Sequence, residues 1–311
     1  MKIVIYGTGG VGGYFGAQLA LAGEDVVFIA RGEHLEAIQQ NGLNIETDQG
    51  ETVLAKVQAT DDPKKVAKAD LVIVGVKAWQ VTEVAHKIKS MIGSNTFVLP
   101  LQNGVEAAKE LSLVLGEKHV LGGLCKSLSW VVKPGYIRSI GQIHSILFGE
   151  LDKSASKRTE QLKEVFERAK ITATIAPDIN VALWEKFLFV VSFGGVGTVT
   201  RCPIGVIRKL AGTRLMLEQS MKEVLAIAQN RGIVLSDGIV EKSLAFIDSL
   251  APDATTSLQR DITNGKLSEL ESWNGAVVRL GQQSSVATPL NTFIYNALLP
   301  LELQAREKLS S

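Results

Sequence analysis

The sequence has 311 residues, of which 46% are hydrophobic and 21% charged, a balance typical of a globular protein with roughly two domains. Lysine and arginine number 33 against 32 acidic residues, so the basic excess that a nucleic-acid partner requires is missing. The apolar run in MKIVIYGTGG is too short for a signal peptide, and we expect a cytoplasmic protein. Cys125 and Cys202 lie far apart without CxxC spacing, so we predict neither a disulfide framework nor a metal site.

Short apolar runs alternate with helical patterns from residue 1 to about residue 150. The runs are KIVIYG, DVVFIAR, LVIVGVK, TFVLPLQNG and HVLGGLC. Apolar runs separated by helices are typical of the parallel strands of a doubly wound sheet. The stretch 135–151 alternates in polarity and contains Gly141, which predicts an antiparallel hairpin that turns at this glycine and closes the same sheet.

From about residue 178 to the end, the pattern predicts helices. We expect them over 181–193, 213–231 and 236–249, and over 256–282 with a break near residue 264. The apolar segment 187–200 is shorter than the about 18 to 20 residues of a membrane span and contains three glycines. We therefore expect a buried helix and no membrane partner. The fold class is α/β, with a mostly parallel sheet followed by an all-α C-terminal domain.

A Gly7-x-Gly9-x-x-Gly12 pattern directly follows the first expected strand and precedes a helix. The first glycine allows a tight turn, the second lets the backbone approach a pyrophosphate, and the third lets helix and strand pack closely. The pattern predicts a dinucleotide site, with a purely structural turn as the alternative. NAD sites usually have an acid at the tip of the second strand, but this strand ends in Ala30-Arg31, and Arg31 can pair with a 2'-phosphate. We therefore predict NADP(H), with NAD and a solvated Arg31 as the alternatives.

Two polar residues follow further strands, Lys77 in VGVKAWQV and Asn103 in LPLQNGV. Ligands of open α/β sheets lie outside the carboxyl ends of the strands. Both residues are therefore candidates for the cofactor crevice. The alternatives are a surface lysine at a helix start and an Asn-Gly turn.

Taken together and in order, these motifs resemble the ketopantoate reductase family (2-dehydropantoate 2-reductases) over nearly the whole chain. The matching pieces are GTGGVGGYFG, Arg31, VKAWQV, LQNGVE, WEKF, TSLQRDITNGKLSELESWNG and ATPLNTFIY. The resemblance implies NADPH-dependent reduction of a 2-oxo acid, above all 2-dehydropantoate to pantoate in pantothenate biosynthesis. The change of pattern near residue 177 divides the chain into a cofactor-binding Rossmann-type domain of residues 1–176 and a helical domain of residues 177–311, which we expect to bind the substrate and to dimerise. The resemblance implies an active site in the cleft between them.

Residue by residue, the resemblance makes Lys186 the proton donor and Glu269 a second catalytic residue that helps bind the substrate. The further matches are Ser257 as a substrate contact, Asn103 as the asparagine beside nicotinamide and substrate, and Lys77 as a lysine near the cofactor ribose. Glu271 points elsewhere on the helix that we expect here, so the role goes to Glu269 alone. Structural roles for Lys186, Glu269 and Ser257 are the alternatives.

The helix that carries Lys186 departs from the family pattern. The family typically has asparagines four and eight residues after the lysine, on one helical face, and they help hold the substrate. Here these positions are Val190 and Gly194, and Ser192 lies too far round the helix to replace them. A pocket without these donors loses its discrimination for a substrate hydroxyl, so a different, more apolar 2-oxo acid is an alternative substrate.

Two further functions stay open. One is a catalytically inactive NADP-binding sensor, and the other is a 2-hydroxy- or 3-hydroxy-acid dehydrogenase of similar build. We expect a small-molecule 2-oxo acid as the partner. The apolar helices of residues 205–250 either bury a homodimer interface, which is slightly favoured, or form the domain's own core.

Overall fold

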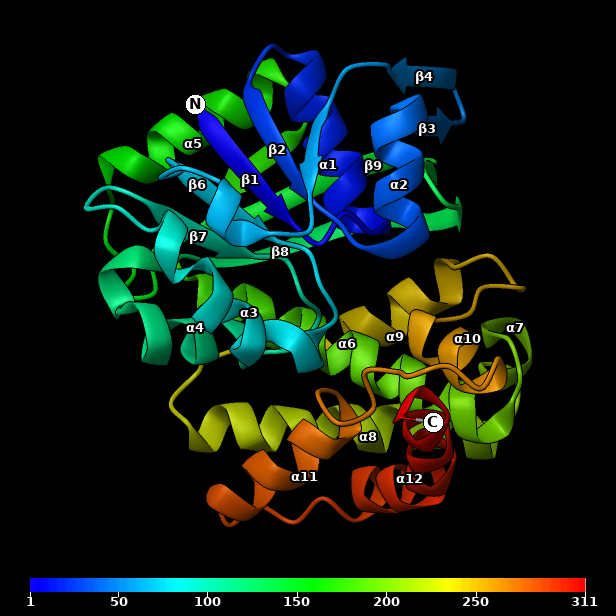
Figure 1. Ribbon diagram of the computed structural model, residues 1–311. Coiled ribbons are helices and arrows are strands. Elements are labelled where there is room, and N and C mark those ends of the chain that lie inside the picture. The colour runs from blue at the N-terminus through cyan, green and yellow to red at the C-terminus, as the bar shows by residue number, and fades with distance from the viewer. Residues whose placement is uncertain (311) are drawn as a thin grey trace. The chain divides into compact units, whose positions relative to one another are not determined.

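The computed structural model describes residues 1–310, except for the side chains at positions 142, 143, 309 and 310. The chain divides into two compact units. The first comprises residues 1–102 and 106–179, and the second comprises residues 103–105 together with the chain from residue 180. Strands and helices alternate in the first unit, whereas the described elements of the second unit are all helices (Figure 1). The predicted α/β class with a helical C-terminal part is confirmed.

A parallel sheet of five strands, in the order β5-β2-β1-β6-β7, forms the centre of the first unit. The strands are β1 (Lys2–Tyr6), β2 (Asp25–Ile29), β5 (Gln58–Thr60), β6 (Leu71–Val74) and β7 (Phe97–Pro100). Alternate residues of β1 enter two different hydrophobic clusters, which explains the continuous apolar runs in the sequence. The strand order reverses between β1 and β6, and dinucleotides bind such sheets at this switch point, beyond the carboxyl ends of the strands.

The first unit contains a second sheet, which the sequence analysis did not predict. It consists of β3 (Leu43–Thr47), β4 (Gly50–Leu54), β8 (Gly122–Lys133), β9 (Tyr136–Gly149) and β10 (Thr172–Ile175). The prediction of a hairpin that turns at Gly141 is wrong, because the turn lies at Pro134-Gly135, between β8 and β9. Gly141 has φ 92° and lies inside β9, where the β8–β9 register shifts. Its positive φ thus accommodates an irregularity within a strand instead of a turn.

Helix α1 (Gly10–Leu21) packs between the two sheets. A Cβ on Gly16 would lie 2.6 Å from both Ile5 and Phe28 of the first sheet, and a Cβ on Gly13 would lie 2.0 Å from Ile137 of the second. These glycines therefore permit a helix–sheet contact that any side chain would push apart. The other α-helices of this unit are α2 (Gly32–Asn41), α3 (Val81–Ile88), α4 (Ala107–Leu115) and α5 (Lys157–Arg168).

Helix α6 (Ile179–Thr200) contributes the central residues of the second unit's core. It is longer than predicted and continues through Gly194, Gly195 and Gly197. By length and composition it could cross a membrane, but 61% of its apolar window is buried inside the protein, as in the core helix of a soluble protein. The expected buried helix is confirmed. Around it lie α7 (Ile204–Ile207), α8 (Ala211–Asn230), α9 (Ile239–Ser249), α10 (Ser257–Thr263), α11 (Asn274–Gln283) and α12 (Pro289–Ser310).

A chain of buried polar side chains connects α6 to α8 and α12. Ser192 donates a hydrogen bond of 2.9 Å to Ser220, which in turn donates to the side-chain oxygen of Asn291 at 3.2 Å. The same oxygen accepts from Asn274 at 2.9 Å, and the Asn291 amide donates to Glu223 at 2.7 Å. Ser192 therefore points into the helical core.

Candidate functional site

The glycine loop after β1 has the geometry that a dinucleotide requires. Gly7 has φ 98°, and a Cβ there would lie 2.6 Å from the Val76 side chain. A Cβ on Gly12 would lie 2.2 Å from the Gly7 carbonyl oxygen, whereas a Cβ on Gly9 would meet no described atom within 4 Å. Gly7 thus makes the turn, Gly12 allows the close packing of helix on strand, and the space beside Gly9 is open to a pyrophosphate.

The first backbone amides of α1 are directed to the same space. Gly9 is the N-cap of this 12-residue helix, and no described side chain caps it. The amides of Gly7 and Thr8 instead donate to the Ile29 carbonyl at 3.2 Å, and the Thr8 hydroxyl donates to the same oxygen at 3.0 Å. The loop is therefore fixed to β2, while the helix N-terminus is left for an anion. These residues fit a dinucleotide cofactor.

Arg31 and Lys77 follow the two strands that flank β1. Arg31 is exposed and forms the N-cap of α2, two residues after β2 ends. Lys77 is half-buried and follows β6, at the start of the short 3-10 helix η2 (Ala78–Gln80). Gly7, Arg31 and Lys77 thus lie beyond the carboxyl ends of three adjacent strands, β1, β2 and β6.

Within the second unit, the chain segments that contain Ser257 and Glu269 pack against α6 at Gly194. A Cβ on Gly194 would lie 2.6 Å from Trp273 and 3.4 Å from Leu258. Leu258 follows Ser257 directly at the start of α10, and the Trp273 amide donates to the Glu269 carbonyl at 3.0 Å. The place at which the resemblance leads us to expect a second asparagine is therefore filled by an indole ring. Gly194 lets these two segments pack closely against α6, and it does not line an open pocket.

Asn103 lies in the short segment that belongs to the second unit. A Cβ on Gly104, which has φ 116°, would lie 3.4 Å from the carbonyl oxygen of Ser272. Val105 packs against the helical core. The predicted substrate residues Asn103, Lys186, Ser257 and Glu269 thus all belong to one compact unit.

We assigned different directions to the Glu269 and Glu271 side chains on the assumption that both lie in a helix. This assumption is wrong, because residues 269–273 form turns before α11. Glu271 has other partners nevertheless. It accepts a hydrogen bond of 2.7 Å from the Tyr295 hydroxyl and forms an ion pair with Arg279. Burial and the nearby Glu271 carboxylate together raise the pKa of Tyr295 to about 12. Glu269 is 7% exposed, and it remains our candidate for the substrate role.

Apolar side chains share the face of α6 that carries Lys186. Phe189, Val190 and Phe193 follow the lysine at spacings of three, four and seven residues, which places all four on one side of the helix. The ring of Phe189 lies 5.9 Å from that of Phe193 and 5.2 Å from that of Phe246 on α9. This aromatic group was not predicted from the sequence. The helical spacing of Phe189, Val190 and Phe193 after Lys186 could have indicated part of it.

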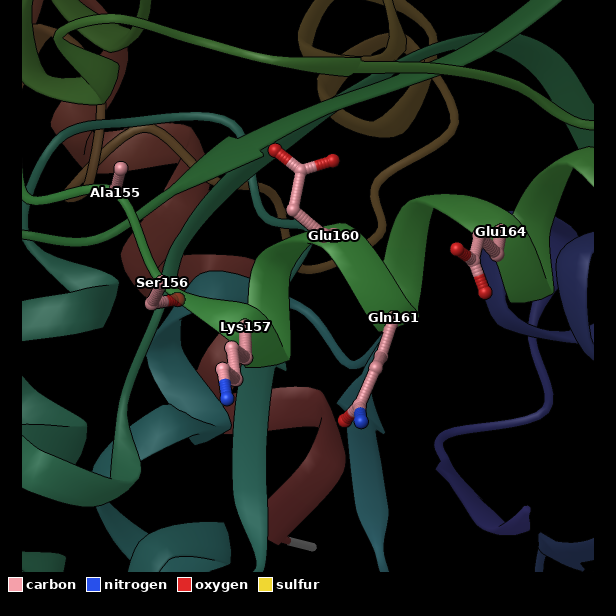
Figure 2. Close-up of a pocket in the computed structure, with 6 residues that line it drawn as sticks. All are labelled: Ala155, Ser156, Lys157, Glu160, Gln161 and Glu164. Atoms are coloured by element: carbon pink, nitrogen blue, oxygen red, sulfur yellow. The ribbon is translucent and has the colours of Figure 1, made fainter.

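An open hollow lies at the start of α5 in the first unit. Figure 2 shows its lining, which consists of Ala155, Ser156, Lys157, Glu160, Gln161 and Glu164. It contains none of the predicted site residues, so we assign no function to it. Among the described residues, no three His, Cys, Asp or Glu side chains are grouped to hold a metal ion.

Comparisons with known proteins identify the family. The model described as "Ketopantoate reductase PanE/ApbA" matches residues 3–153, and "Ketopantoate reductase PanE/ApbA C terminal" matches residues 178–302. The chain belongs to the ketopantoate reductase family. It is therefore an oxidoreductase, and the coenzyme of this family is a nicotinamide dinucleotide.

Named relatives agree with this result. The chain is 30% identical to a 2-dehydropantoate 2-reductase of Nostoc sp., over 96% of this chain and 94% of the relative. It is 27% identical to the uncharacterized oxidoreductase YkpB of Bacillus subtilis, over 98% and 100%. A PanE/ApbA family ketopantoate reductase from Ralstonia eutropha superposes with a TM-score of 0.90 at 28% identity, over 98% and 100%. A D-mandelate dehydrogenase solved with NADH also has a TM-score of 0.90, but its 24% identity shows the fold alone.

Proposed function

We propose that this protein reduces a 2-oxo acid to the 2-hydroxy acid with NADPH, and that 2-dehydropantoate is the first substrate to test. The open glycine loop at the switch point carries the proposal most directly. Family membership supports the reaction class. We further propose that residues 1–176 bind the coenzyme, that residues 177–311 bind the substrate and bury a homodimer interface, and that the enzyme is cytoplasmic.

Lys186 is the proposed proton donor. A nicotinamide coenzyme held at the glycine loop would supply the hydride, so that negative charge would develop on the reacting carbonyl oxygen. In our proposal the Lys186 ammonium hydrogen-bonds this oxygen and donates a proton to it. A cation that meets charge as it develops stabilises the transition state more than the ground state.

The remaining polar residues orient the substrate in this proposal. The Ser257 hydroxyl and the Asn103 amide hold the substrate carboxylate. Thr256 caps α10 by accepting from the Gln259 amide at 3.2 Å, so this cap does not use the Ser257 hydroxyl. Glu269 accepts a hydrogen bond from a substrate hydroxyl or from the Lys186 ammonium.

NADPH is preferred to NADH in this proposal because of Arg31. The exposed guanidinium at the start of α2 suits a planar, bidentate contact with the 2'-phosphate. Lys77 is the proposed contact near the coenzyme ribose. Arg31→Ala is expected to weaken NADPH binding by about 10- to 100-fold, the typical loss of a charged hydrogen bond, and to leave NADH binding within about twofold. Fluorescence titration with both coenzymes measures this, and equal losses for both would contradict the assignment.

A second candidate substrate is a more apolar 2-oxo acid. The observation that favours it is the aromatic group beside Lys186, formed by Phe189, Phe193 and Phe246, with Val190 where the family places an amide. An apolar wall binds a hydrocarbon side chain and cannot pair a hydroxyl.

A substrate panel tests the proposed function. NADPH oxidation is followed by absorbance with 2-dehydropantoate and with branched and aromatic 2-oxo acids that lack a hydroxyl. A wide preference for 2-dehydropantoate would exclude the second candidate. Tight NADPH binding without turnover of any 2-oxo acid would refute the enzyme and support a sensor.

A further inference from the structure

His34, which the sequence analysis did not single out, joins the glycine loop to the turn between β8 and β9. It lies half-buried in the first turn of α2. Its Nε2 is 2.7 Å from the Thr8 carbonyl oxygen, and its Nδ1 is 3.0 Å from the Gly135 backbone nitrogen. A backbone N–H can only donate, so Nδ1 accepts and Nε2 carries the proton that it donates to Thr8. The ring is thus a neutral imidazole whose two nitrogens are both hydrogen-bonded.

The far end of this connection is itself fixed. The Gly135 carbonyl accepts hydrogen bonds from the backbone and the side chain of Asn44 in β3, at 2.9 and 3.3 Å. Gly135 has φ 72°, and a Cβ there would lie 3.0 Å from that of Ala37 in α2. The tight turn therefore gives His34 a rigid point of attachment on the second sheet.

The near end lies in the middle of the proposed coenzyme site. Thr8 is the residue between Gly7 and Gly9, and its amide and hydroxyl are already bonded to Ile29. Arg31 precedes His34 by three residues and caps the same helix. The bond from His34 to Thr8 therefore fixes the glycine loop relative to the first turn of α2, and so relative to the Arg31 backbone.

We propose that His34 is a positioning residue that sets the separation between the pyrophosphate loop and Arg31, and thereby the preference for a coenzyme with a 2'-phosphate. This inference rests on the proposed NADPH site. A 2'-phosphorylated dinucleotide must meet the loop and Arg31 at once, whereas NADH needs no contact with Arg31. Loss of a preorganised spacing therefore affects NADPH more than NADH.

The test compares His34→Leu, which removes both hydrogen bonds, with His34→Gln, which keeps a donor and an acceptor. His34→Leu is expected to raise the Kd and the KM for NADPH by about 3- to 10-fold, with kcat and the Kd for NADH within about twofold of wild type. His34→Gln is expected to restore part of the loss. Fluorescence titration and steady-state kinetics of the full chain give these values.

His119→Leu is the matched control. His119 is 7% exposed, and its Nδ1 lies 2.7 Å from the Thr96 carbonyl oxygen, the same distance as in the His34–Thr8 bond. This control loses a comparable buried bond outside the glycine loop. It should lower the thermal midpoint and leave the ratio of the two Kd values unchanged. Equal effects of the two leucine variants on this ratio would overturn the inference.

A double-mutant cycle with Arg31→Ala gives the sharpest result. If His34 acts through the placement of Arg31, His34→Leu should weaken NADPH no more than NADH once Arg31 is absent. If His34→Leu and Arg31→Ala instead change the ratio of the two Kd values independently of each other, the inference is overturned. Wild-type protein that binds neither dinucleotide would refute the proposed function itself, an outcome seen before any variant is made.

Discussion

Trp273 fills the space that a side chain at position 194 would need. A Cβ on Gly194 would lie 2.6 Å from Cζ3 of this ring, which is 2% exposed. We expect Gly194→Ala to lower the free energy of unfolding by about 1–3 kcal/mol, because overpacking outweighs the gain in helix propensity. Urea unfolding measures this. Gly212→Ala in α8 is the control, since its Cβ would meet no described atom within 4 Å, and we expect stability to be unchanged or higher.

Val190→Asn should move substrate preference toward hydroxylated 2-oxo acids. Val190 is half-buried, so an amide there can reach a ligand without entering the core. One added neutral hydrogen bond predicts a change of about 2- to 10-fold in the ratio of kcat/KM values for 2-dehydropantoate and an apolar 2-oxo acid. Val199→Asn, also half-buried but on the opposite side of α6, should leave the ratio unaltered. An equal change in both variants would argue against a pocket at Val190.

Lys186→Ala should lower kcat by about 10²- to 10⁴-fold, the usual contribution of a general acid, while NADPH binding stays within about twofold. Lys186→Arg should recover little, because a guanidinium retains its proton. Lys222→Ala, which removes an exposed lysine paired with Glu218, is the control and should leave kcat unchanged. Single-turnover and binding measurements separate the two effects. Near-normal turnover of the alanine variant would remove Lys186 from the mechanism.

Glu269→Gln and Glu271→Gln should separate activity from stability. Glu271 accepts from Tyr295 and pairs with Arg279, so its variant should lose about 0.5–1.5 kcal/mol of stability and keep its kcat. Glu269→Gln should raise KM or lower kcat. The reverse pattern would transfer the substrate role to Glu271.

Unfolding should become easier in mild acid. Burial lowers the pKa of His34, although the hydrogen bond to Thr8 opposes the shift, and burial likewise lowers the pKa of His144. The folded state thus favours the neutral rings. The two neutral rings make their full contribution to the free energy of unfolding above the ordinary histidine pKa of about 6.5. This contribution is lost as the pH falls through the lower pKa values that the two histidines have in the folded protein. Between about pH 7 and pH 5, the free energy of unfolding measured with denaturant should therefore fall less steeply for His34→Gln than for wild type. An identical slope would contradict this origin.

The glycine loop and four of the five parallel strands were predictable because both leave local signals. Gly7 needs its positive φ whatever the rest of the chain does, and strands buried on both faces are apolar throughout. Strand β5 was not predicted, and the expectation that HVLGGLC forms a strand of this sheet is wrong for residues 122–125, which begin β8 of the second sheet. The second sheet was not predictable, since Asn44 in β3 pairs with Tyr136 in β9, far away in the sequence. The position of the turn was not predictable from Gly141, because a glycine suits a turn and a strand irregularity equally.

The polar residues proposed for the site come from family motifs, whereas the contacts around them could not be predicted from the sequence. The proposed role of His34 depends on Gly135, 101 residues later, and Phe246 contacts Phe189 from another helix. The departure of Gly194 from the family pattern was visible in the sequence. The position of the Trp273 ring beside Gly194 was not, because it depends on how residues 269–273 turn before α11.

The two sides of helix α6 differ in burial and in what they contact. The buried side holds Gly195 and Ser192, which face the chain of amides and hydroxyls that ends at Glu223. The other side holds Lys186 and Val190, which are only half-buried. A substitution on the half-buried side should therefore disturb the helical core less than one on the buried side. Under the proposed function, this side of α6 is where a change of substrate preference costs the least stability.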